Sequence, residues 1–198
     1  FKPCFRYVKP IISSVDYAVA NLETTLTDTP PYTGYPRFRS PSQMADALAD
    51  AGVNMVTTAN NHTLDNDAEG VLSTIAISHR AGLEVIGTSR PNPLRVNIKG
   101  FDIAFLTYTH STNGIPIPEG VDVPMLDTVR MARDLELCRD AECRVAFLHW
   151  GAEYVTRPSR NQREIADFLH RSGCEVVIGS HPHAVQRAEC SKSRVTVY

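Results

Sequence analysis

The sequence Glu175-Val176-Val177-Ile178-Gly179-Ser180-His181-Pro182-His183 runs from an apolar segment directly into two histidines. A short apolar run of this kind is typical of a buried strand. Gly179 allows close backbone approach, and the two histidines beyond it can turn their imidazoles toward one region. Zn, Mn and Fe all accept imidazole nitrogen as a ligand. The alternative is a polar turn that carries two exposed histidines.

The same pattern occurs three more times along the chain. Residues 145–148 lead into His149, residues 53–59 lead into Asn60-Asn61-His62, and residues 15–20 lead into Asn21-Leu22-Glu23. In open α/β sheets, functional residues gather at the carboxyl ends of the strands. We therefore expect these side chains at one edge of a sheet, where they form a metal-dependent hydrolytic site or the remains of one.

Helical and strand patterns alternate between these segments. Strands are predicted at 15–20, 53–58, 83–86, 144–148 and 175–178, with hairpins at 94–108, turning at Lys99-Gly100, and at the end of the chain. Helices are predicted at 40–51, 66–80, 127–139 and 161–171, the first with Ser40 as N-cap and Pro41 in the first position. The alternation implies parallel βαβ units, and the hairpins make the sheet mixed. The predicted fold class is α/β.

The composition is that of a soluble globular protein. Hydrophobic residues make up 42% of the chain, charged residues 21%, and the formal net charge is -2. Lysine and arginine are scattered, which argues against a nucleic-acid partner or a polybasic membrane surface. The chain begins at Phe1 and stops at Tyr198 inside a strand-like run. We expect residues 1–198 to be a single domain cut from a longer protein.

The five cysteines contain no Cys-x-x-Cys pair of the zinc-binding type. Cys138 and Cys143 are close enough in sequence for a local disulfide. The other interpretation is that all five are free structural thiols.

Asn60-Asn61-His62 offers two kinds of chemistry. The amide oxygen of Asn61 can bind a hard divalent metal, and His62 can then serve as proton donor. Asp65, three residues on, can orient the His62 ring. A helix-capping loop is the simpler alternative, since Asn and Asp are common before a helix.

Further residues are candidates by position. Spacing of two places Asn21 and Glu23 on one face of an extended segment. His110 follows the strand in the 94–108 hairpin and is expected in the pocket wall. The remaining candidates for substrate binding are Asn60, Trp150, Glu153, Tyr154, Arg37 and Arg39. The two arginines suit an anionic substrate, although such residues are often only solvated.

These residues, in this order, resemble the CapA family of bacterial capsule (poly-γ-glutamate) synthesis proteins. The matching pieces are Asn21-Leu22-Glu23, Asn60-Asn61-His62 with Asp65, His149-Trp150-Gly151 with Glu153-Tyr154, and Gly179-Ser180-His181-Pro182-His183. The resemblance spans nearly the whole chain. The Gly-Asp motif of the family's first strand is missing, as is the Ser-Leu-Gly-Asn-type segment expected after Val197-Tyr198.

The resemblance implies a fold similar to calcineurin-like metallophosphoesterases, a mixed-sheet β-sandwich flanked by helices. It implies that Glu23, Asn61, His149, His181 and His183 bind one or two divalent ions (Zn, Mn or Fe), that Glu23 replaces a usual Asp, and that His62 donates a proton. It also implies a location outside the cytoplasm, at the cell surface or anchored to the membrane, with a membrane capsule-synthesis complex as a candidate partner.

Two functional hypotheses follow. The first is a metal-dependent hydrolase that cleaves a phosphoester or an amide, its substrate an anionic cell-surface polymer or a small molecule. The second is a non-catalytic module that holds an anionic polymer within a capsule synthesis or export machine. The first requires a divalent metal to activate water and His62 to protonate the leaving group. The second needs neither.

Overall fold

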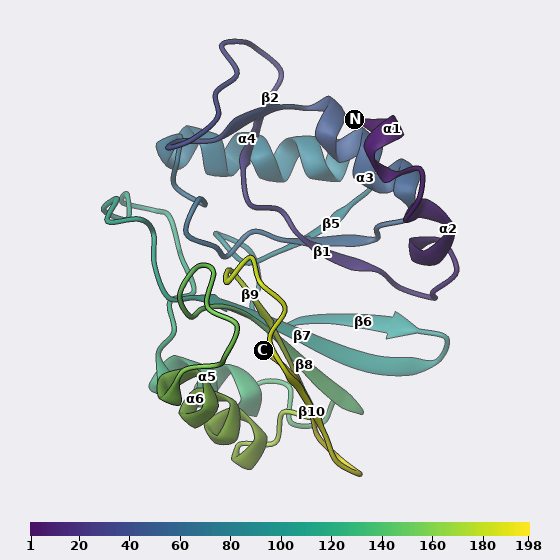
Figure 1. Ribbon diagram of the computed structural model, residues 1–198, viewed down its shortest axis with the longest axis vertical. Helices are drawn as coiled ribbons and strands as arrows, with labels where there is room; N and C mark the ends of the chain where they lie inside the picture. The colour runs from purple at the N-terminus through teal and green to yellow at the C-terminus, as the bar shows by residue number, and fades with distance from the viewer. The chain divides into compact units, whose positions relative to one another are not determined.

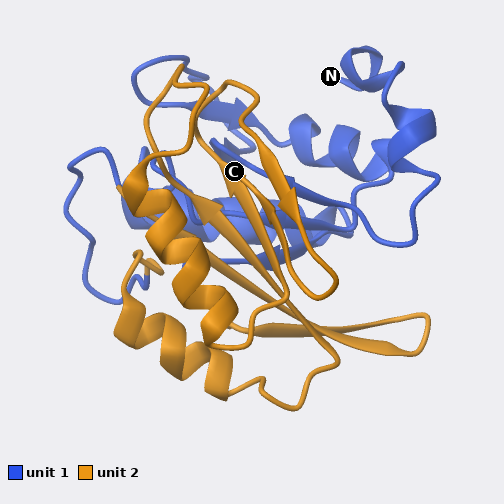
Figure 2. Cartoon of the chain, turned by 60° about the horizontal axis from the view of Figure 1, so that its bottom comes forward, with its two compact units in different colours: residues 1–90, 112–122 blue, residues 91–111, 123–198 orange.

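The computed structural model describes residues 1–198 and contains two compact units. Unit 1 comprises residues 1–90 and 112–122, and unit 2 comprises residues 91–111 and 123–198 (Figure 2). Each unit has its own sheet and its own apolar core. The α/β fold class predicted from the sequence is confirmed, with sheets flanked by helices. The prediction of a single domain stays a prediction.

Unit 1 is built on a small parallel sheet in the order β1-β4-β5, formed by Val19–Asn21, Met55–Thr57 and Glu84–Ile86. A second parallel pair joins β2 (Thr25–Thr27) to β3 (Arg39–Pro41). The helices are α1 (Lys2–Phe5), α2 (Lys9–Ile12), α3 (Gln43–Ala51) and α4 (Asp67–Arg80).

The core of unit 1 lies between these helices and strands. Leu48 of α3 and Ile77 of α4 are buried in one cluster with Val56 of β4 and Val85 of β5. Helix α3 ends at Gly52, whose φ of +99° is the left-handed conformation that glycine adopts without strain. This end of α3 was predicted correctly.

The start of α3 was predicted wrongly. Ser40 and Pro41 belong to β3, where they pair with Leu26 and Thr27 of β2, and the helix begins at Gln43. The Ser-Pro pair looks like a helix start because Ser caps and Pro fits the first turn. Here the pairing with β2 holds that stretch extended instead. Neither β2 nor β3 is among the elements predicted from the sequence.

Unit 2 is built on a mixed six-stranded sheet in the order β10-β11-β9-β8-β7-β6. The strands are β6 (Leu94–Ile98), β7 (Phe101–Thr109), β8 (Cys143–His149), β9 (Val176–Ser180), β10 (Ala188–Cys190) and β11 (Val195–Val197). Strands β7, β8, β9 and β11 are parallel, and the β6–β7 and β10–β11 hairpins are antiparallel. Both predicted hairpins are present, so the prediction of a mixed sheet is confirmed.

Two helices cover one face of this sheet. Helices α5 (Thr128–Glu136) and α6 (Arg160–Arg171) lie side by side in Figure 1. Met131 and Leu169 pack from these helices against Leu106 and Leu148 of the strands. Helix α6 begins with a complete capping box between Ser159 and Gln162. The core therefore fixes the parallel strands whose carboxyl ends carry the predicted site residues.

An ion pair also joins the starts of β8 and β9. Arg144 donates hydrogen bonds to the carboxylate of Glu175 from its side chain and its backbone. Partial burial raises the pKa of Glu175, but the hydrogen bonds from Arg144 outweigh that effect and leave the pKa below its usual value.

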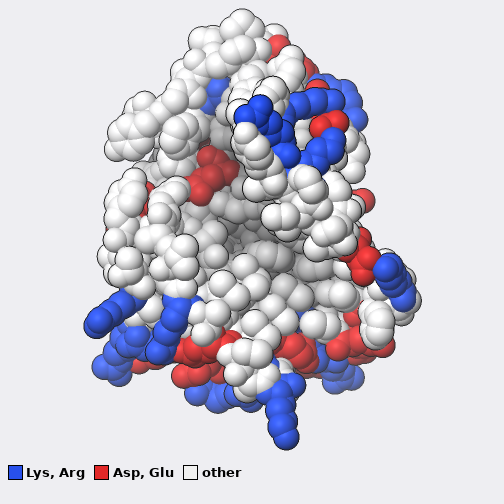
Figure 3. Space-filling view, turned by 45° about the vertical axis from the view of Figure 1, so that its right-hand side comes forward, with Lys and Arg blue, Asp and Glu red and all other residues white.

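Three smaller findings complete the description. All five cysteines are free, which agrees with the structural-thiol interpretation of Cys138 and Cys143. No helix has both the length and the apolar character required to cross a bilayer. On the face shown in Figure 3, acidic and basic side chains are interspersed rather than separated by sign.

Candidate functional site

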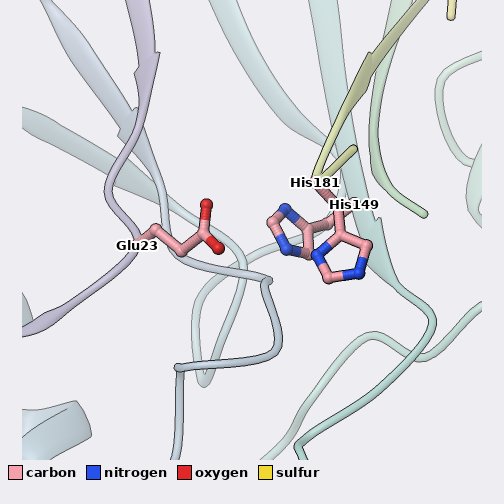
Figure 4. Close-up of side chains that lie close together, drawn as sticks. All are labelled: Glu23, His149 and His181. Atoms are coloured by element: carbon pink, nitrogen blue, oxygen red, sulfur yellow. The ribbon is translucent and has the colours of Figure 1, made fainter. Parts of the chain in front are cut away.

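His149 and His181 form the centre of the candidate site in unit 2. His149 is the last residue of β8, and His181 directly follows β9, which pairs with β8 up to Ser180. Their ring centroids are 4.7 Å apart, and Figure 4 shows the two imidazoles next to each other. His149 is 2% exposed, and His181 is partly exposed. Neighbouring parallel strands thus bring the two histidines together. The other two motif segments follow β1 and β4, which form a separate sheet, so the expectation that all four end at one sheet edge is wrong.

Ser180 contacts the inner ring nitrogen of His149. The Oγ atom of Ser180 lies 2.9 Å from Nδ1 of His149 and donates to the carbonyl oxygen of Leu148 at 3.5 Å. Because the Ser180 proton is used in that second bond, Nδ1–H of His149 is assigned as the donor to Ser180. Nε2 then carries the lone pair that a metal ion accepts. A hydrogen bond on the other ring nitrogen is typical of metal-binding histidines.

His183 and His110 extend the imidazole cluster. The ring centroid of His181 lies 6.3 Å from that of His183 and 4.6 Å from that of His110. His110 donates from its backbone N–H and from Nδ1 to the carbonyl oxygen of His149. The sequence placed His110 only in the pocket wall. Its place opposite His149 follows from strand pairing, since Thr109 of β7 pairs with His149.

The backbone around these histidines adopts rarely populated conformations. His181 has a φ of +94°, His183 of +51° and Tyr154 of +61°. Positive φ is uncommon for residues other than glycine, and such strain concentrates at functional sites. It shows that the surrounding structure, rather than local preference, holds both histidines in place.

Buried amides hold the loops behind this cluster. Gln162 of α6 donates to Gln186, and Gln186 donates to the carbonyl oxygen of Val155. Tyr154 N–H donates to the carbonyl oxygen of Pro182. These bonds tie the loop after β8 to the loop after β9. The two glutamines are not among the predicted site residues, because nothing in a single sequence marks an amide as the partner of a distant loop.

The remaining predicted residues of unit 2 differ in their surroundings. Trp150 is 1% exposed, and its ring stacks with Tyr198 in the core, so its contacts are those of a packing residue. Glu153 and Tyr154 are exposed, and the Tyr154 ring stacks near His183 with centroids 6.0 Å apart. The predicted role of all three in substrate binding stays a prediction.

Unit 1 holds the other predicted residues around the ends of β1 and β4. Glu23, also labelled in Figure 4, accepts a hydrogen bond of 3.0 Å from Asn21. Asn60 is fully buried and donates to the Asn21 side chain and to the carbonyl oxygen of Leu22. Its own oxygen accepts from the His62 N–H. Asn60 therefore joins the loop after β4 to the loop after β1, and its predicted contact with substrate stays a prediction.

Asn61 follows Asn60 and is 3% exposed. Its amide nitrogen donates to the Asn113 side chain at 3.1 Å. Because the nitrogen makes this bond, the amide orientation is assigned, and the oxygen is the atom suited to a hard metal ion. Asn113 was not identified from the sequence. It lies in a loop of unit 1 far along the chain, and its φ of +53° is one that Asn tolerates.

His62 and Asp65 form a buried pair in the same loop. Nδ1 of His62 lies 2.7 Å from Oδ2 of Asp65, which also accepts from the backbone N–H of Phe38 at 2.6 Å. The Phe38 ring packs edge-on against His62 with centroids 4.4 Å apart. The ring is thus held on one edge by a carboxylate and on one face by an aromatic side chain. This is the His62–Asp65 arrangement predicted from the spacing of three.

Arg37 and Arg39 lie in unit 1, with Arg37 exposed and Arg39 partly buried. Arg39 donates to the Pro31 carbonyl oxygen and to Thr27 Oγ1. Both arginines line a pocket beside β2 and the start of α4. Their predicted contact with an anionic substrate is untested.

The donor set of unit 2 fits a divalent metal. Two adjacent imidazoles are available, one with its second nitrogen oriented by Ser180. That chemistry suits Zn, Mn or Fe and not Mg or Ca, which prefer oxygen.

Comparison with known proteins identifies the family. The model of the bacterial capsule synthesis protein family PGA_cap matches residues 1–198. The chain belongs to this family. Two curated relatives are the PGA biosynthesis protein CapA of Bacillus subtilis (strain 168), 23% identical over 214 residues, and the capsule biosynthesis protein CapA of Bacillus anthracis, 28% identical over 213 residues. The resemblance found in the sequence motifs is therefore confirmed.

The matched regions differ in extent. Each alignment covers 98% of this PGA_cap chain but only 54% and 51% of the two relatives, so the chain spans about half of their length. A solved structure of a hypothetical protein from Thermus thermophilus matches with a TM-score of 0.59 and 16% identity. That match covers 98% of this chain and 68% of the other. At this identity the similarity supports the fold alone.

Proposed function

We propose that this member of the PGA_cap family is a metal-dependent hydrolase that acts on a phosphoester or amide in capsule or other anionic cell-surface polymer synthesis. The observation that carries the proposal is the His149–His181 pair, with Ser180 Oγ lying 2.9 Å from Nδ1 of His149. The names of the relatives, PGA and capsule biosynthesis proteins, support the choice of substrate class.

The proposed metal ligands are the five expected from the resemblance. His149, His181 and His183 would supply imidazole nitrogen, and Glu23 and Asn61 would supply oxygen. The divalent cation (Zn, Mn or Fe; one or two ions) would provide Lewis acidity at the scissile group and toward water. A carboxylate such as Glu23 offsets part of the metal charge that neutral ligands leave uncompensated.

His62 is the proposed general acid. Its Nδ1–H points to Asp65, so the proton that reaches a leaving group comes from Nε2. Asp65 does not touch the substrate in this scheme. It holds the ring, together with Phe38, so that no free energy is needed to orient the imidazole during the reaction.

Metal content and turnover test this proposal together. The purified protein is incubated with Zn, Mn or Fe, freed of excess ion and analysed for bound metal. It is then assayed on an aryl phosphodiester and on poly-γ-glutamate. We expect bound metal, with turnover that a chelator abolishes and metal restores. Protein that retains no metal from any of the three ions would refute the hydrolase.

A non-catalytic polymer-binding module is the second candidate. The exposed Arg37 and the aromatic ring of Tyr154 are surface groups that a bound anionic polymer can contact without turnover. Poly-γ-glutamate affinity that is the same with and without chelator, with no release of product, would favour this candidate. The proposed partners are a polymer or small-molecule substrate and, for the longer protein, a membrane capsule-synthesis complex outside the cytoplasm.

A further inference from the structure

A polar pocket of about 290 Å³ lies within unit 1, beside β2 and the N-terminal end of α4. Its wall includes two cationic side chains, Arg37 and Arg39, and three acidic ones, Asp65, Asp67 and Glu69. No ion pair joins either arginine to these carboxylates. A pocket wall whose positive and negative side chains are not paired with each other favours a ligand that carries one positive and one negative group. A purely anionic ligand would meet a net excess of negative charge.

Asp65 is the most constrained member of this wall. It is 2% exposed, and its Oδ2 is occupied by His62 and by the Phe38 N–H. Its Oδ1 is buried without a hydrogen-bond partner. A buried carboxylate oxygen left unpaired is unfavourable, and a nearby ammonium group compensates it. The pocket therefore has a place for a positive charge.

The start of α4 provides a place for a negative charge. Asn66 is at the N-cap position but makes no capping hydrogen bond with its side chain. Its amide nitrogen donates instead to Thr25 Oγ1 and to the carbonyl oxygen of Phe38. The first-turn N–H groups of α4 thus lack the usual side-chain cap, and the positive end of the helix lies beside Arg37 and Arg39.

We propose that this pocket binds an α-amino acid head group, with the ligand carboxylate toward Arg37, Arg39 and the α4 N-terminus and the ligand ammonium toward Asp65. Such a head group occurs on a free amino acid and also at the amino end of a γ-linked glutamyl chain, where the α-amino and α-carboxylate groups remain on the same carbon. All of these residues belong to unit 1, and the proposed binding requires no metal.

Isothermal calorimetry on the whole chain, with a chelator present, tests the proposal. The probes are D-glutamate, L-glutamate and the dipeptide γ-glutamylglutamate, compared with glutarate, which lacks the ammonium, and ethylamine, which lacks the carboxylate. We expect at least one zwitterionic probe to bind ~10-fold or more tightly than either half-ligand, as expected for losing one charge-assisted hydrogen bond. Tighter binding of the dipeptide identifies the chain end as the source, and tighter binding of glutamate identifies the free amino acid.

Variants connect the binding to these residues. Arg39→Gln and Glu69→Gln should each lower the affinity for the zwitterionic probes. Arg80→Gln, at the C-terminal end of α4 and outside the pocket, should leave that affinity unchanged. Asp65→Asn should weaken the ammonium-bearing probes most. In NMR spectra of the wild-type protein, the ring resonances of His62 should shift when a zwitterionic probe is added. Asp65 is bonded to His62 and, in the proposal, also contacts the ammonium of the probe.

Several results would overturn the proposal. Glutarate binding as tightly as glutamate would make the pocket an anion site, and ethylamine binding as tightly would make it a cation site. The absence of binding heat with every probe would also refute the proposal. So would equal losses of affinity in Arg80→Gln and Arg39→Gln. Because metal is excluded throughout, none of these results bears on the hydrolase, and loss of hydrolysis does not bear on the pocket.

Discussion

His181 has an unfavourable backbone conformation and a ring placed in the histidine cluster. Its φ of +94° is unfavourable for a residue with a Cβ, yet its ring lies beside those of His149 and His110. Strain of about 1–3 kcal/mol persists only where the surrounding structure enforces it. The hydrogen bond from Tyr154 N–H to the Pro182 carbonyl oxygen is part of that enforcement.

His181→Ala should lower metal affinity at least ~10–100-fold, because even residues that only orient a ligand contribute that much. The melting temperature of the metal-free protein should change little, since the side chain is only partly buried. Metal titration and thermal melting measure the two effects. His79→Ala, an exposed histidine on α4, is the matched control and should alter neither. Unfolding of the metal-free variant with normal metal binding would show that His181 is structural.

His62→Asn should leave metal content intact and lower turnover by ~10²–10⁴-fold, the usual scale for general acid catalysis. The loss should be smallest for aryl phosphates, whose leaving groups need no proton. Asp65→Asn should give a weaker copy of the same defect, because its Oδ2 orients the ring without touching the substrate. Single-turnover assays with good and poor leaving groups compare the variants. Equal losses with both substrates would remove His62 from the role of acid.

At the level of elements, β9 reaches the site through a glycine that has no room for a side chain. A Cβ on Gly179 would lie 2.5 Å from Trp150 Nε1 and 2.7 Å from the backbone carbon of Tyr198. Contacts this short require movement, and the second partner is backbone. The close packing of β8, β9 and β11 at this point therefore requires Gly179, immediately before Ser180 and His181.

Gly179→Ala should destabilise the protein by about 1–3 kcal/mol, the usual cost of overpacking. It should also weaken metal binding, because β9 carries Ser180 and His181 on its end. Gly34→Ala is the control, since a Cβ there meets nothing within 4 Å and its φ is not in the left-handed region. Chemical denaturation and metal titration provide the readouts. A Gly179→Ala protein as stable as Gly34→Ala would contradict the packing argument.

At the scale of the whole molecule, the proposed metal ligands come from segments far apart in the sequence. Glu23 follows β1, and His149 is the last residue of β8. If one ion contacts both, the energetic effects of removing the two residues are coupled, because each variant leaves the other ligand without its metal.

Glu23→Gln and His149→Ala should therefore weaken metal binding by amounts that do not add in the double variant. The coupling measured by the double-mutant cycle should be at least ~0.5 kcal/mol. Metal should also raise the melting temperature of the wild-type protein, because binding to the folded state alone stabilises it. Strictly additive losses would mean that Glu23 and His149 do not share an ion.

Much of this architecture can be predicted from the sequence, because its signals are local. Apolar runs specify strands, Gly52 ends α3, and Lys99-Gly100 turns the β6–β7 hairpin through two positive φ angles. The His62–Asp65 pair is equally local, since a spacing of three within one loop suffices to bring the two side chains together. Family membership follows from the same short motifs at strand ends.

Tertiary structure alone decided the features that depend on distant partners. Ser40-Pro41 has a helix-start sequence but forms β3, because pairing with β2 satisfies its backbone. Trp150 follows His149 in sequence but is buried in the core, where its ring packs against Tyr198 and Gly179. Ser180, Asn113 and Gln162 act through bonds to residues far along the chain. Local sequence sets backbone preference and periodicity, whereas buried hydrogen bonds and close packing are determined only when separate segments meet.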